Sequence, residues 1–140
     1  MIARSKGKWA FLSYVILYGS LTSAAQEPLF RLLDAQRTGI QFENTISETE
    51  GLNVLAYEYF FNGAGVAVGD LDNDGLPDLV FTANMRGNKV FKNMGGLTFR
   101  EMTQQIGGGI EGRPGGWKTG VTLADVNNDG LADLFVAKGN

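Results

Sequence analysis

The feature that most constrains this chain is a nine-residue acidic loop that occurs twice. The first copy runs from Asp70 to Asp78, and the second runs from Asp125 to Asp133. In both copies oxygen-bearing side chains stand at positions 1, 3, 5 and 9, and glycine stands at position 6. Glycine permits a tight bend, and a loop that winds round an ion turns alternate side chains inward. The pattern therefore predicts two sites for a hard cation.

Calcium is the ion that suits these loops best, because it takes six to eight oxygen ligands. Neither loop contains histidine or cysteine, which zinc prefers, and magnesium would keep more water and fewer protein ligands. We expect the backbone carbonyls at position 7, those of Leu76 and Leu131, to complete each set. The predicted side-chain ligands are Asp70, Asp72, Asp74 and Asp78 in the first loop, and Asp125, Asn127, Asp129 and Asp133 in the second.

Two other interpretations of the loops need to be weighed. Asp-Gly between apolar runs is a strong hairpin signal without any metal, so both loops could be plain turns. The matched Asp and Asn positions around both turns favour the metal interpretation. An EF-hand or dockerin-like loop needs a carboxylate at position 12, where this chain has Phe81 and Val136, and the sequence excludes it.

Residues 1–25 have the three parts of a secretory signal peptide. Three basic residues precede an apolar run over residues 9–21, and Ser23-Ala24-Ala25 follows with small side chains. The alternative is a retained anchor, but the run is shorter than the roughly 20 residues of a spanning helix. We therefore expect cleavage before Gln26, no stable membrane insertion afterwards, and a protein that is secreted: extracellular, periplasmic or at the cell surface.

Charge and composition exclude several classes of function. The chain has 12 Lys and Arg against 15 Asp and Glu, and seven of those acids lie in the two loops. Nucleic acid would require a basic stripe, and no cluster of Lys or Arg occurs beyond the N-terminus, so we expect no nucleic-acid partner. Cysteine is absent, so the chain has no disulfide and no thiol chemistry.

A repeat of short strands sets the expected architecture, which is all-β. Residues 65–70 correspond to residues 120–125, and each segment reads as a strand that enters an acidic loop. Strands over 79–83 and 134–138 leave the loops, and 89–92 and 98–102 add two more after the first loop. Four short antiparallel strands per unit are typical of a β-propeller blade.

The resulting division of the chain has four parts. We expect a signal peptide over 1–25, a capping strand and loop over 26–56, a first repeat over 57–111 and a truncated second repeat over 112–140. The strand of the second part is predicted at Ile40 to Phe42, where apolar residues alternate. Because a propeller closes with about 4 to 8 blades, the chain is expected to be an incomplete propeller of about two blades, the N-terminal portion of a longer protein.

The residues that carry these strands and loops resemble a known family. Residues 60–70, 88–93 and 116–121, together with the two loops, are similar to secreted FG-GAP/VCBS-repeat proteins. Among these proteins the chain most resembles the bacterial relatives of cartilage acidic protein, which usually end in an ASPIC/UnbV domain. The resemblance implies a fold like the integrin α-subunit propeller, with calcium at the loop positions named above. It also implies a role in cell adhesion or recognition, with an extracellular protein or glycan as partner.

Two alternatives remain open at the level of sequence. The chain could be part of a propeller enzyme that acts on extracellular polysaccharide, or it could be a non-functional truncated reading frame. Against catalysis, the segment after residue 25 contains no His, no Cys and a single serine, Ser47, so the common pairs of nucleophile and base cannot be assembled. We therefore expect a scaffold without catalytic residues rather than an enzyme.

Overall fold

A computed structural model describes residues 28–112 and 116–139 of the chain. The chain divides into two parts, residues 1–31 and 32–140. In the first part, residues 28–31 belong to no helix or strand, and the predicted signal peptide over 1–25 lies outside the described residues. No helix in the described ranges is long and apolar enough to cross a membrane.

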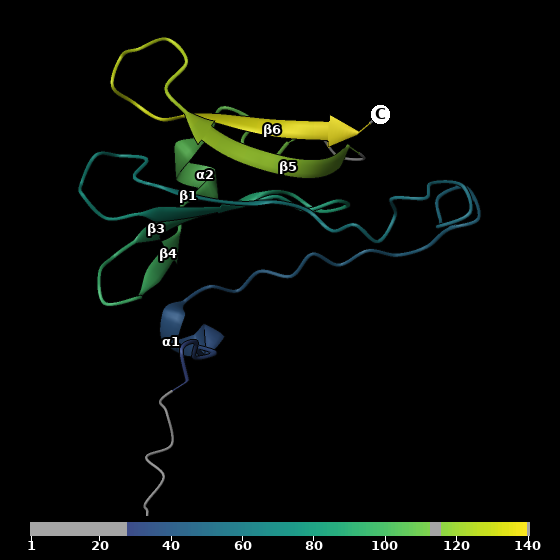
Figure 1. Ribbon diagram of the computed structural model, residues 1–140, viewed down its shortest axis with the longest axis horizontal. Helices are drawn as coiled ribbons and strands as arrows, with labels where there is room; N and C mark the ends of the chain where they lie inside the picture. Colours follow the sequence, from purple (N-terminus) through teal and green to yellow (C-terminus); the bar gives the residue numbers. More distant parts are fainter. Residues whose placement is uncertain (1–27, 113–115, 140) are drawn as a thin grey trace, which may run out of the picture. The chain divides into compact units, whose positions relative to one another are not determined.

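The second part contains one complete four-stranded antiparallel sheet with the strand order β1-β2-β3-β4 (Figure 1). Strands that are neighbours in this sheet are also consecutive in the sequence, as in a propeller blade. Gly69 pairs with Asp78 next to the first acidic loop, and Leu79 pairs with Phe91 in the following strand. The bounds are β1, Val66–Gly69; β2, Asp78–Phe81; β3, Lys89–Asn93; β4, Phe99–Glu101.

A second, two-stranded antiparallel sheet follows, formed by β5 (Trp117–Ala124) and β6 (Asp133–Gly139). Ala124 pairs with Asp133 beside the second loop, just as Gly69 pairs with Asp78 beside the first. The strands predicted for the two repeats are thus confirmed, together with the all-β class. The structure extends β5 to Trp117 through a register shift between Lys118 and Gly120.

The core lies between the two sheets. Ala67, Val80 and Val90 come from one face of the first sheet, and all three are buried. Partly buried side chains pack against them, and several of these come from the second sheet: Leu71, Ile110, Val121, Leu123 and Leu134. The period-2 alternation of the strands produces this arrangement, since it turns every second residue toward the same face.

Close approach of β1 to β5 depends on Gly65. A Cβ at this position would lie 2.8 Å from the backbone nitrogen of Val121, which is closer than packed atoms allow. A Cβ on Gly69 would meet the side chain of Leu123 at 2.7 Å. Residues 65 and 69 therefore face residues 121 and 123 in the same order, so β1 and β5 run in the same direction where they pack together.

The segment before β1 contains a correction to the sequence-based expectation. Residues 40–42 form no strand; a short helix, α1 (Ala35–Thr38), precedes them instead. Asp34 caps its start by accepting a hydrogen bond from the Gln36 N–H at 2.7 Å. The segment is held to the blade by side chains rather than by a strand ladder: Phe42 stacks on Phe81 with ring centroids 4.9 Å apart.

Asparagine side chains add to this attachment. The Asn44 amide donates to the Asn84 side-chain oxygen at 2.7 Å, and Asn84 donates in turn to the carbonyls of Gly63 and Lys118. Asn84 is fully buried, so these contacts satisfy its polar atoms. One side chain thus joins the N-terminal segment, the approach to β1 and the start of β5. A second short helix that the sequence did not predict, α2 (Thr103–Ile106), follows β4.

One group of aromatic residues packs around Trp117. Trp117 is buried and lies between Tyr57 and Phe60, with ring centroids 5.6 and 5.1 Å away. Its burial assigns Trp117 to packing rather than to a ligand-binding surface.

Candidate metal centre

The two acidic loops have the same backbone conformation. Each joins the first two strands of its sheet, and each places an asparagine in the left-handed region, Asn73 with φ 56° and Asn128 with φ 61°. The following glycines, Gly75 and Gly130, have φ 85° and 83°. Asparagine and glycine are the residues that adopt this region most readily, which explains both choices. The asparagine at position 4 shapes the loop, and its role was not predicted from the sequence.

The hydrogen bonds that the aspartates at positions 1 and 9 accept also match between the two loops. Asp70 accepts from the N–H groups of Asp74 at 3.1 Å and Gly75 at 2.8 Å. Asp125 accepts from Asp129 and Gly130 at the same two distances. At position 9, Asp78 accepts from the Leu71 N–H at 3.0 Å, and Asp133 accepts from its counterpart, the Val126 N–H, at 3.1 Å.

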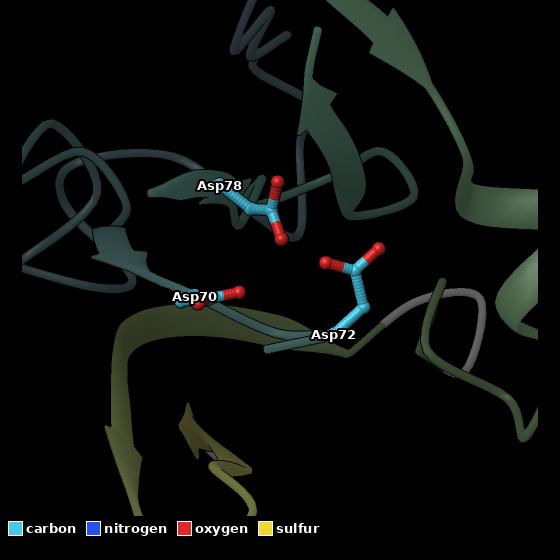
Figure 2. A group of neighbouring side chains, drawn as sticks. All are labelled: Asp70, Asp72 and Asp78. Atoms are coloured by element: carbon cyan, nitrogen blue, oxygen red, sulfur yellow. The ribbon is translucent and has the colours of Figure 1, made fainter. Parts of the chain in front are cut away.

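Three carboxylates of the first loop converge on one space, as Figure 2 shows for Asp70, Asp72 and Asp78. One oxygen from each lies within 4.8 Å of the other two. Two oxygens on opposite sides of a calcium ion, each 2.3–2.6 Å from it, are separated by about 5 Å at most. The three oxygens are therefore close enough together to bind one such ion.

Asp74, the fourth predicted side-chain ligand, is paired with Lys92. The Lys92 ammonium contacts a carboxylate oxygen of Asp74 at 2.6 Å and also contacts Asp72. The hydrogen bond from Lys92 is the main reason that the pKa of Asp74 is lowered, with the Leu76 N–H contributing next. Hydrogen bonds to Asp72 and then to Asp74 raise the pKa of Lys92.

Lys92 places a positive charge against the loop oxygens. This contact was not predicted from the sequence, because Lys92 lies on β3, well beyond the loop in the chain. The loop therefore fits a cation in two respects: its donors are all oxygens, and an ammonium group already lies against two of them. A calcium ion that used Asp72 and Asp74 would have to displace Lys92 from those oxygens, because the two cations repel each other.

Asp78 has a second task besides its place in the loop. It is 2% exposed, and its other carboxylate oxygen accepts the Asn93 N–H at 2.8 Å. Asn93 in turn donates its side-chain amide to the Pro77 carbonyl at 2.9 Å. The carboxylate of Asp78 thus ties the end of the loop to β3, and both of its oxygens have a backbone partner.

The carboxylates of the second loop converge less closely than those of the first. Asp125 and Asp129 are exposed, and Asp133 is half-buried. Among the described residues, the acidic group with three carboxylates in ligand range is the one in the first loop, so Asp125, Asp129 and Asp133 do not reach that arrangement. The Asn127 amide instead donates to Asp129 at 2.9 Å. The second calcium site stays a prediction, as do the backbone ligands, the carbonyls of Leu76 and Leu131.

Comparison with known proteins agrees with this geometry. Residues 70–136 match the family model of the FG-GAP-like repeat. The matched segment begins at the first loop position, contains both loops and ends within β6. Together with the repeated strand–loop–strand unit, the match places this part of the chain in the FG-GAP repeat family. No curated protein and no solved structure shows a significant match to the chain.

Proposed function

We propose that this chain is a secreted, calcium-binding FG-GAP/VCBS-repeat propeller segment that acts as a non-enzymatic scaffold for adhesion or recognition. The observation that supports calcium most directly is the convergence of Asp70, Asp72 and Asp78, with one oxygen of each within 4.8 Å of the others. The identical hydrogen-bond frame of the second loop supports a second site of the same kind. The partner proposed is an extracellular protein or glycan.

Calcium would act mainly on the stability of the blades. Without an ion the first loop brings several carboxylates together, and within the described part of the chain Lys92 is the side-chain cation that offsets their repulsion. An ion held by both ends of a loop stabilises the folded form alone. With a dissociation constant of about 0.1 mM and about 1–2 mM calcium outside the cell, the stabilisation is roughly 1.5 kcal/mol per site.

Calorimetric titration with calcium tests the proposal. The wild-type chain should bind two ions, and Asp72→Asn and Asp129→Asn should each lose one of them. Asp34→Asn makes the same chemical change outside the loops, and asparagine also caps helices well, so this control should keep both ions. Magnesium should bind far more weakly. A wild-type chain that binds no calcium at millimolar concentration would overturn the metal assignment.

The export proposal rests on the sequence and has its own test. Protein recovered from the medium or periplasm should begin at or near Gln26, as measured by intact mass. Material that retains residues 1–25 would contradict it. The scaffold proposal predicts that calcium-loaded protein binds a glycan or protein surface without changing the mass of the partner, whereas released oligosaccharides would favour the enzyme alternative.

A further inference from the structure

A pocket lined by two lysines lies between the loop that follows α2 and the second sheet. Its volume is about 580 Å³. Lys118 and Lys138 supply its charge, while Ile106, Ile110, Leu134 and Val136 supply apolar walls. None of the predicted metal ligands lines this pocket, so it is a separate site from the calcium loops.

Lys118 is an unusual lysine because it is only 4% exposed. Within the described ranges its amine has neither a hydrogen-bond acceptor nor a carboxylate within salt-bridge distance, although Lys89 and Lys92 each have an acidic partner. Burial, and secondly repulsion from Lys138, lower the pKa of Lys118.

The two lysines are neighbours across the strands, since Lys118 on β5 pairs with Lys138 on β6. Like charges placed directly opposite each other destabilise a sheet. Lys138 is exposed, so its side chain could point away from Lys118 into solvent. The side chains of Lys118 and Lys138 nevertheless line the same pocket. The pocket therefore concentrates positive charge that the described residues do not neutralise.

The glycine-rich loop after α2, residues 107–112, leaves room for the Lys118 side chain. A Cβ on Gly112 would lie 3.1 Å from the Lys118 Cδ and 3.6 Å from its Nζ. It would also lie 3.5 Å from the side-chain nitrogen of Asn88, which lines the same pocket. Gly112 has φ 75°, so a larger residue would be strained there as well as crowded. The lack of a side chain at Gly112 thus leaves room for the Lys118 side chain to lie against this loop.

We propose that this pocket binds an organic oxyanion, such as a carboxylate carried on a small apolar group, with Lys118 and Lys138 holding the charged end. Two ammonium groups can donate charge-assisted hydrogen bonds to one oxyanion, and such bonds are about twice as strong as neutral ones. The isoleucine, leucine and valine walls account for the apolar part, because burying it releases ordered water.

Calorimetric titration in excess chelator tests the pocket without any contribution from calcium. The probes are acetate, isovalerate and inorganic phosphate, each compared with chloride at equal ionic strength. Isovalerate should bind more tightly than acetate because only it reaches the apolar walls. Phosphate binding as tight as isovalerate binding would mean that the charge alone is recognised, which would overturn the organic part of the proposal.

Three variants locate the binding. Lys118→Met should weaken isovalerate binding roughly 10-fold or more, as expected for the loss of a charge-assisted hydrogen bond. Lys138→Glu changes an exposed residue, so it should leave the fold intact and abolish binding. Lys89→Met removes one positive charge outside the pocket and should leave the affinity within about 2-fold.

Thermal unfolding keeps the test valid if Lys118→Met changes the fold. Isovalerate should raise the melting temperature of the wild-type chain and of Lys89→Met, and it should leave that of Lys138→Glu unchanged. A wild-type chain that binds none of the probes at millimolar concentration, or a Lys89→Met variant that loses as much affinity as Lys138→Glu, would overturn the proposal.

Discussion

Asp78→Asn offers a test of how the structure holds the first loop. Asp78 is 2% exposed, and each of its carboxylate oxygens accepts one backbone N–H, from Leu71 and from Asn93. Asparagine has one acceptor oxygen and would present its NH₂ group to the other N–H. One buried N–H would then lose its partner, at a cost of about 1–3 kcal/mol. The remaining bond would become a neutral one, which adds about 1 kcal/mol.

The second loop supplies a matched control for this change. Asp133 occupies the same loop position, is half-buried and accepts one N–H, that of Val126. Asparagine could still accept that bond, so Asp133→Asn should cost about 1 kcal/mol or less. Both substitutions remove one negative charge from an acidic loop, so any relief of repulsion affects them alike. We therefore expect Asp78→Asn to be the more destabilising change by about 2 kcal/mol.

Urea denaturation followed by circular dichroism measures this difference, and it must be done in chelator so that lost calcium binding does not contribute. A difference of this size is a substantial share of a domain stability of about 5–15 kcal/mol. Equal destabilisation by the two variants would refute the reasoning, since it would mean that the Asn93 N–H does not depend on the Asp78 carboxylate.

Three further outcomes are expected. Lys92→Met should tighten calcium binding at the first loop about 2- to 5-fold in calorimetry while leaving the second loop unchanged, because the competing ammonium is gone; weaker binding would show that Lys92 supports the site. Gly65→Ala should lower the free energy of unfolding by about 1–3 kcal/mol through the contact with the Val121 nitrogen, whereas Gly51→Ala, with open space around it, should be near neutral in the same urea assay. Because the folded state lowers the pKa of Lys118, the unfolded chain binds that proton more tightly, so stability should rise as pH increases toward 10.5, and Lys118→Met should lose this rise relative to wild type.

Local patterns in the sequence were sufficient to predict the repeated unit. Strand alternation predicted β1 to β6, and the spacing of Asp, Asn and Gly predicted the two loops at positions that the structure shows to share one conformation. These features depend on residues close together in the chain. Backbone preference at Asn73 and Gly75, and hydrogen bonds from the N–H groups of Asp74 and Gly75 to Asp70, are set within the loop itself.

The same local reasoning failed at residues 40–42. Their alternation predicted a strand, but backbone pairing requires a partner strand edge at the right distance, and the segment is held instead by Phe42 on Phe81 and by Asn44 on Asn84. No local pattern reports whether such an edge is available. The helix α2 was missed for a related reason, since tertiary contacts outweigh weak local preference.

What only the tertiary structure decided is which distant charges meet. Lys92 lies on β3, and the fold places its ammonium on Asp72 and Asp74 because the antiparallel sheet folds β3 back beside the loop between β1 and β2. Lys118 and Lys138 become neighbours only through the pairing of β5 with β6. The sequence by itself determined the loops and the strands, since both arise from short-range geometry. The charges around them depend on chain reversal, which brings together residues that lie far apart in the chain.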